Sequence, residues 1–259
     1  MTNRSLVLCE GYHDRAFWAE MLLSRRWLDP GVQQGTGQRK PIQDPWDDNK
    51  KVQGGDFLFN RPAPSDVSVR VIPCMGKTKI IPRLRRCLAE RSTRPVRSII
   101  VCVDMDTDAS EAPDLANGAH QAVQNVLQDP DFGMRLDSGG RFVLSDGTRI
   151  DVVAWRTNDG ACLELPEKQT LERVICTAIH KTYPSRCPAV AAWLASRPEP
   201  PAANPHHKAM AWSHMAGWFA DNGSEDFFRA IWRDRSIAGY LMELVRHMGL
   251  DALLCDLEV

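Results

Sequence analysis

Ser98-Ile-Ile-Val-Cys-Val-Asp-Met-Asp-Thr-Asp108 is the stretch of the chain that says most about its fold. A short apolar run rich in β-branched residues and bounded by charge predicts a buried strand over residues 98–103. The strand leads into Asp104, Asp106 and Asp108. Two carboxylates spaced i, i+2 at the end of a buried strand repel each other unless a cation neutralises them, and an open set of oxygen ligands suits Mg²⁺. The alternative is structural, because aspartate commonly ends strands and caps helices.

A second set of carboxylates follows an apolar run near the N-terminus. Residues 6–9 predict another short strand, and Glu10 comes directly after it. Asp14 then begins a run whose apolar residues repeat at helical spacing. Because ligands bind outside the carboxyl ends of strands in an open parallel α/β sheet, we expect Glu10 to converge there with Asp104 and Asp106. With Asp14 nearby, these acids predict a metal pocket.

The strand–Glu–Gly–x–x–Asp–helix element at residues 6–22, followed by the strand that ends in Asp-x-Asp at 98–106, resembles a toprim domain. Toprim is the topoisomerase–primase fold, shared by topoisomerases, primases, small RNA-processing nucleases and the overcoming-lysogenization-defect (OLD) family nucleases. The run at 69–81, a strand followed by Gly-Lys and a helix, is more similar to the OLD branch. The resemblance covers 5–175 in pieces. It implies an α/β, Rossmann-like, mostly parallel sheet flanked by helices, with an inserted loop region and a C-terminal helical extension.

The resemblance also implies a Mg²⁺ or Mn²⁺ cofactor and assigns roles to single residues. The family's glutamate maps onto Glu10, and its paired aspartates map onto Asp104 and Asp106, as catalytic metal ligands. Further acids that OLD-type and small standalone members carry are matched here by Asp14, Asp108, Glu111 and Glu164. Lys208 matches an accessory lysine that would stabilise charge developing on the phosphate. The structural alternatives are a favourable charge at a helix start for Glu164 and a surface position for Lys208.

The distribution of charge indicates the substrate. The 259-residue chain has a formal net charge of −1, but residues 76–97 hold eight basic residues and one acidic residue. A basic helix beside an acidic metal pocket suits a phosphodiester backbone, since the cations hold phosphates and the metal bridges the scissile one. We therefore expect DNA or RNA to contact the cations Lys77, Lys79, Arg83 and Arg86. The alternative is a solvated helix face.

The alternation of strands and helices predicts a catalytic part over residues 1–181, with an insertion at about 28–66. A helical extension over 182–259 is expected to pack on it. The predicted strands are 5–10, 67–73, 98–103 and 150–155, and the predicted helices are 14–27, 78–91, 113–128 and 167–181. Residues 141–150 predict a hairpin. Residues 184–205, rich in proline and alanine, predict a linker or a stiff loop.

Composition is that of a soluble globular protein, with 43% hydrophobic and 25% charged residues. No apolar run approaches the ~18 residues required for a membrane span, and the N-terminal pattern is not that of a signal peptide. None of the eight cysteines forms a Cys-x-x-Cys pair. We therefore expect reduced thiols in a cytoplasmic protein.

Together these observations predict a Mg²⁺-dependent toprim endonuclease, a hydrolase of nucleic-acid phosphodiester bonds. Gly76-Lys77-Thr78 lacks the upstream glycine of a phosphate-binding P-loop, so no ATPase is expected in this chain. The resemblance therefore implies an effector of antiviral defence with a separate ATPase subunit, and homo-oligomers are compatible with it. The alternative from another class is a non-catalytic toprim module that binds a protein partner or nucleic acid. The sequence does not choose between DNA and RNA.

Overall fold

A computed structural model describes residues 3–32, 40–46, 51–52, 55–108, 118–130, 133–137, 141–157, 165–196, 207–216 and 224–258. The chain divides into two compact units. The first, here called the sheet unit, comprises Met1–Val103, Ala119–Val153 and Leu253–Val259. The second, here called the helical unit, comprises Asp104–Gly118 and Ala154–Ala252. The predicted division at about residue 181 stays a prediction.

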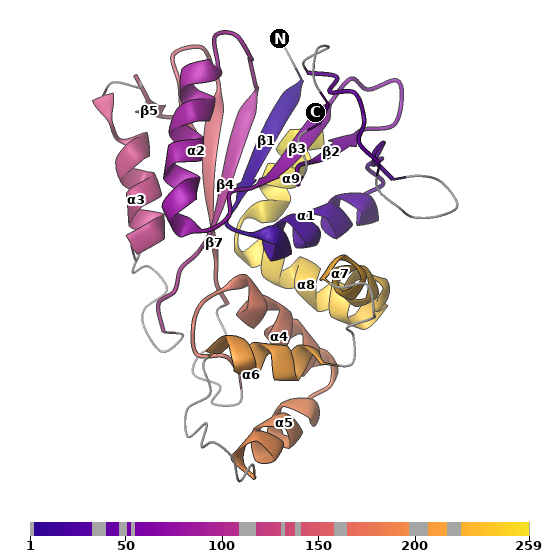
Figure 1. Ribbon diagram of the computed structural model, residues 1–259. Coiled ribbons are helices and arrows are strands. Elements are labelled where there is room, and N and C mark those ends of the chain that lie inside the picture. Colours follow the sequence, from indigo (N-terminus) through magenta and orange to yellow (C-terminus); the bar gives the residue numbers. More distant parts are fainter. Residues whose placement is uncertain are drawn as a thin grey trace. The chain divides into compact units, whose positions relative to one another are not determined.

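A seven-stranded sheet in the order β2-β3-β1-β4-β7-β6-β5 organises the fold (Figure 1). Its strands are β1 (Arg4–Cys9), β2 (Phe57–Asn60), β3 (Ser68–Pro73), β4 (Ser98–Asp104), β5 (Arg135–Leu136), β6 (Phe142–Val143) and β7 (Arg149–Trp155). The strand β1 runs parallel to β3 and β4, whereas β2 and the β5–β6–β7 meander contribute antiparallel pairs. The fold is therefore a Rossmann-like α/β fold with a mostly parallel, mixed sheet, as the sequence predicts.

The predicted core strands correspond closely to β1, β3, β4 and β7, and the predicted hairpin is the β6–β7 pair. One difference concerns the segment expected to be an inserted loop region. Within it, Phe57–Asn60 forms β2 and pairs antiparallel with β3 at the edge of the sheet. This strand is too short for its apolar residues to show a period in the sequence.

Three helices of the sheet unit follow strands, namely α1 (Tyr12–Ser24), α2 (Lys77–Glu90) and α3 (Gly118–Leu127). The predicted helix over 14–27 ends early, at Ser24, and Arg26 takes a left-handed conformation with φ 66°. The helix expected from residue 113 is described only from Gly118, because residues 109–117 lie outside the described part of the chain.

The register of the sheet brings three strand ends to one edge. Cys9, the last residue of β1, pairs with Pro73 of β3 and with Cys102 of β4. Side chains alternate between the faces of a strand. Cys102 lies on the face covered by α1, where its sulfur accepts a hydrogen bond from Trp18 Nε1 (3.1 Å). Leu6, three residues before Cys9, lies on the other face and lines a cavity with α2.

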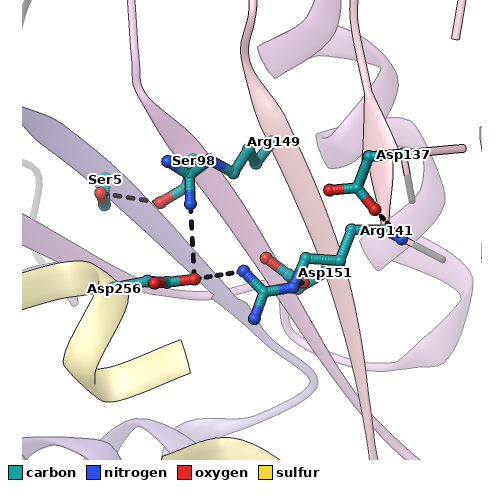
Figure 2. A network of polar contacts seen from close by, with 7 residues as sticks. All are labelled: Ser5, Ser98, Asp137, Arg141, Arg149, Asp151 and Asp256. Carbon is teal, nitrogen blue, oxygen red and sulfur yellow. Dashed lines mark hydrogen bonds and ion pairs between the residues drawn. The ribbon is translucent and has the colours of Figure 1, made fainter. Parts of the chain in front are cut away.

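The last turns of α9 (Leu250–Glu258) are tied to the sheet by a polar network at the starts of the strands (Figure 2). Asp256 accepts hydrogen bonds from Arg141 and from Arg149 (3.4 Å). Beside them, Ser98 Oγ donates to Ser5 Oγ at 2.8 Å, which links β4 to β1. This network therefore lies at the N-terminal ends of β1, β4 and β7, whereas Glu10 and Asp104 lie at the C-terminal ends of β1 and β4.

The helical unit contains α4 (Leu171–Thr182), α5 (Arg186–Ala195), α6 (His207–Met215), α7 (Ser224–Arg233) and α8 (Arg235–His247). Helix α4 packs against α6 and α8. The prediction of a linker or stiff loop is wrong over α5, where an alanine-rich run is helical and Pro188 lies in the first turn, which tolerates its missing N–H. Among the residues described, no helix combines the length and the apolar character that crossing a membrane would require.

We predict that the contact between α1 and the sheet carries much of the stability of the sheet unit. Trp18 is fully buried, so Trp18→Ala should lower the free energy of unfolding by about 3–5 kcal/mol through the cavity left behind. Leu136→Ala, at a side chain that is 62% exposed on β5, should lower it by less than about 0.5 kcal/mol. Urea unfolding of both variants measures this, and equal losses would contradict it.

Candidate functional site

The loop after β1 carries the first predicted acids. Glu10 directly follows the strand, and its carbonyl accepts a hydrogen bond from the N–H of Gly76 (2.8 Å), in the loop after β3. Gly76 has φ 111°, a conformation open mainly to glycine. The Asp14 side chain is buried and accepts a hydrogen bond from the N–H of Gly11 (3.2 Å). Asp14 therefore stabilises the start of α1.

The loop after β4 carries the paired aspartates. Asp104 is the last residue of β4, and its Oδ1 accepts a hydrogen bond from the N–H of Leu171 (3.0 Å), the first residue of α4. Asp106 has φ 55°, and its N–H donates to the Gln169 carbonyl (3.1 Å). A carboxylate at the N-terminus of a helix is stabilised by the exposed N–H groups there. One carboxylate oxygen of Asp104 therefore has a structural role, as the partner of the N-terminus of α4.

The other predicted site residues are placed less fully. Asp108 forms an ion pair with Lys168. Glu111 and Glu164 lie outside the described residues. Lys208 falls in the first turn of α6, but its side chain lies outside what the structure describes.

The adjacency of β1 and β4 is what the structure contributes to the predicted metal site. Cys9 of β1 lies level with Cys102 of β4. Glu10 directly follows Cys9, and Asp104 lies two residues after Cys102. In the part of the chain that is described, no group of three or more His, Cys, Asp or Glu side chains is arranged to hold a metal ion. Metal binding by Glu10, Asp104 and Asp106 therefore stays a prediction.

Most of the predicted nucleic-acid-binding cations gather at the end of β3. Lys79, Arg83 and Arg86 line one open pocket of about 420 Å³, together with Tyr12 of α1. This pocket, here called the edge pocket, lies in the sheet unit beside the loops that follow β1 and β3. Lys77, the first residue of α2, does not line it.

A smaller and more enclosed cavity of about 100 Å³ lies between α2 and four residues that precede β2, namely Asp44, Trp46, Lys51 and Asp56. It shares Asp56, Arg83 and Arg86 with the edge pocket. Arg70 of β3 points into it and forms an ion pair with Asp44. This space is here called the Arg83 cavity.

Aromatic rings hold two arginines of this region in place. The Arg70 guanidinium lies over the Trp46 ring, 4.5 Å from its centre. On the other face of the sheet, Arg15 of α1 is buried with its guanidinium 3.7 Å from the centre of the Phe57 ring. Cation–π contacts of this kind are stronger when they are desolvated. The segment that contains β2 is thus fixed to both faces of the sheet unit.

Asp56 has an unusual environment. Its Oδ2 is buried and has no hydrogen-bond partner among the described residues. Desolvation by burial raises its pKa from 3.8 to about 6, although the charges of Arg70, Arg83 and Arg15 oppose the shift. The charge of Asp44 adds to the rise in pKa. Asp56 is therefore a carboxyl group that takes up a proton just below neutral pH.

Sequence reasoning missed Asp44, Trp46 and Asp56, all of which lie in the segment expected to be a loop region. One signal was present in the sequence. Arg70 interrupts an otherwise apolar strand, Val69-Arg70-Val71-Ile72. A buried arginine requires an acid to pair with, but the sequence does not say which acid.

The comparisons with known proteins bear on the fold. No family model matches the chain, and no curated protein is significantly similar to it. The crystal structure of a hypothetical protein from Pyrococcus horikoshii OT3 matches with a TM-score of 0.65 at 14% sequence identity, covering 99% of this chain and 99% of that one. At this identity the likeness shows a shared fold, and the function has to be argued from the site.

We predict that Asp56 makes stability depend on pH. The folded state holds the Asp56 proton up to about pH 6, whereas the unfolded chain loses it near 3.8. The ionised group therefore destabilises the fold above pH 6, and this penalty disappears as the pH falls towards 4. Asp56→Asn should raise the free energy of unfolding by about 1–3 kcal/mol at pH 8 and change it little at pH 4.

Urea unfolding at both pH values measures the effect. Asp66→Asn, at an exposed acid of the same unit, is the control and should show no such dependence. If the wild type were more stable than Asp56→Asn at pH 8, the raised pKa of Asp56 would be contradicted.

Proposed function

We propose that the protein is a metal-dependent toprim nuclease that hydrolyses phosphodiester bonds in DNA or RNA. The observation that carries the proposal is the side-by-side pairing of β1 and β4. Glu10 directly follows β1 and Asp104 ends β4, in a sheet whose strand β3 ends at a cation-lined pocket. Mg²⁺ or Mn²⁺ would be held by Glu10, Asp104 and Asp106. The donor set fits, because these carboxylates are hard oxygen ligands. When bound, such metals stabilise the attacking and leaving oxygens of the reaction.

The chain's own residues would bind and orient the nucleic acid. Lys79 and Arg86 line the edge pocket and would neutralise backbone phosphates, with Lys77 and Arg83 on the same helix. Tyr12 is 42% exposed in the same pocket and offers a ring on which a base can stack. Beyond the described side chains, Lys208 is proposed as an accessory cation.

The remaining acids have supporting parts in this proposal. Asp14, Asp108, Glu111 and Glu164 are proposed to complete a second metal site or to steer a metal-bound water. The toprim resemblance alone supports a cytoplasmic role in antiviral defence with a separate ATPase subunit.

A second function, a non-catalytic module that binds a protein or nucleic acid, is favoured by different contacts. Asp104 accepts from Leu171, and Asp108 pairs with Lys168, so both acids have structural partners. Under this alternative the acids would hold the loop after β4 against the start of α4, and no metal would be needed.

We predict that removing the paired aspartates abolishes metal-dependent cleavage. The purified protein is incubated with duplex DNA, single-stranded DNA, structured RNA and tRNA, with Mg²⁺, Mn²⁺ or EDTA. Asp104→Asn/Asp106→Asn should lower the cleavage rate by at least about 100-fold, because metal stabilisation of the transition state is worth several kcal/mol. Asp66→Asn should leave the rate unchanged.

A thermal-unfolding titration with Mg²⁺ separates the outcomes. If the double variant cleaves as fast as the wild type, the proposed metal site is wrong. Metal stabilisation without cleavage, lost in the double variant, would support the site and indicate a missing partner. Neither cleavage nor metal stabilisation would leave the binding module as the function.

We also predict that the edge pocket contacts the nucleic-acid backbone. Lys79→Ala should weaken binding of a DNA or RNA duplex and lower the slope of log affinity against log salt by about 0.9, the value for one phosphate contact. Arg85→Ala, on the same helix but outside both cavities, should change the slope little. Salt titrations by fluorescence anisotropy measure both, and equal slopes for Lys79→Ala and the wild type would contradict the contact.

A further inference from the structure

The Arg83 cavity carries an excess of positive charge. Its charged lining comprises Lys51, Arg70, Arg83, Arg86 and Arg94 against Asp44, Asp56 and Glu90. It lies wholly within the sheet unit, and Leu6 and Ile72 of the sheet form its apolar side. A partly open cationic space of about 100 Å³ has room for a single small anionic group.

Most of these charges already have partners. Arg70 pairs with Asp44. Glu90 accepts from Arg86 Nε at 2.7 Å, and Arg94 lies 3.5 Å from the same carboxylate. Arg83 differs, because within the described residues it forms neither an ion pair nor a hydrogen bond, and its Nε is buried.

Three polar atoms around this space are buried without partners in the described part of the chain. The Nε–H groups of Arg83 and Arg70 are donors, and Asp56 Oδ2 is an acceptor. Leaving a buried polar group unsatisfied is expensive, so native structures normally supply a partner. A guest that satisfies all three must present acceptors to the arginines and a donor to the carboxylate.

We infer that the Arg83 cavity binds a terminal phosphate group, either of a phosphomonoester or of free phosphate. A phosphate monoanion has acceptor oxygens, which guanidinium groups bind well, and at least one P–OH that can donate to Asp56. An internal phosphodiester has no P–OH and would place its charge against Asp56 with no donor between them. The cavity therefore distinguishes a chain end or a free phosphate from the backbone phosphates proposed for the edge pocket.

The acidities of the two groups agree with this pairing. The second pKa of a phosphate ester is about 6, and burial raises the pKa of Asp56 to about 6. One proton can therefore be shared between them near pH 6. Binding does not depend on the proposed nuclease activity and is measured without metal.

Calorimetry with the full chain tests the inference. The probes are inorganic phosphate, sulfate, a nucleoside 5′-monophosphate, and an oligonucleotide with either a 5′-phosphate or a 5′-hydroxyl end. We expect the phosphate-bearing probes to bind, and sulfate, which carries no proton at neutral pH, to bind at least about tenfold more weakly. Arg83→Ala should weaken phosphate binding by at least about tenfold, as expected for a charged hydrogen bond. Arg85→Ala should leave it unchanged.

Asp56→Asn gives the most specific outcome. An asparagine amide donates to an anion that carries no proton, so this variant should lose the preference for phosphate over sulfate while still binding both. Thermal unfolding checks that each variant is folded. If Arg83→Ala does not fold, the milder substitution Arg83→Lys is measured in its place.

The probes also identify the source of the phosphate. Binding of inorganic phosphate and the mononucleotide indicates a small phosphorylated ligand, whereas binding restricted to the 5′-phosphorylated oligonucleotide indicates a nucleic-acid end. Failure of every phosphate probe to bind the folded wild type would overturn the inference and leave ordered water as the guest. Equal affinity for sulfate, or phosphate binding that Arg83→Ala and Arg83→Lys both leave intact, would overturn it as well.

Discussion

The parallel pairing of β1 with β3 on one side and β4 on the other organises everything else in the sheet unit. Because Cys9 is level with Pro73 and Cys102, the chain leaves the sheet at the same edge after each of the three strands. The loops that follow β1 and β3 are therefore neighbours, as the hydrogen bond between the Gly76 N–H and the Glu10 carbonyl shows. A shift of β4 by one residue against β1 would turn the side chains of β4 to the opposite face and separate Trp18 from Cys102.

Charge is distributed on this frame in two different ways. At the strand ends, acids accept backbone hydrogen bonds, as Asp104 does from Leu171. Beside α2, cations are in excess and are partly shielded by the segment that contains Asp44 and Asp56. This segment is more than a connection, because β2 makes it part of the sheet and Arg15 anchors it through the Gly55 carbonyl (2.6 Å).

The sequence predicts the core of the fold well for a physical reason. Strands buried on both faces, such as β1 and β4, are continuous apolar runs, and their ends are marked by charge. Short edge elements escape prediction because a strand of two residues, such as β5, has no pattern. The carboxylates after β1 and β4 are found from their position alone. The acid that pairs with Arg70 is not, since Arg70 meets Asp44 across 26 residues of sequence through the tertiary fold.

The contacts of Asp256 have a consequence for how the protein is made. The sheet unit uses chain from both ends, and residues from Leu253 onward belong to it although residues 154–252 do not. Arg141 can pair with Asp151 as soon as β7 forms, but the Asp256 carboxylate that joins Arg141 and Arg149 in Figure 2 arrives only when that late segment has left the ribosome. Synthesis adds about 5–20 residues per second. Arg149 is therefore made several seconds before Asp256, and the contact between them forms late in the synthesis of the sheet unit.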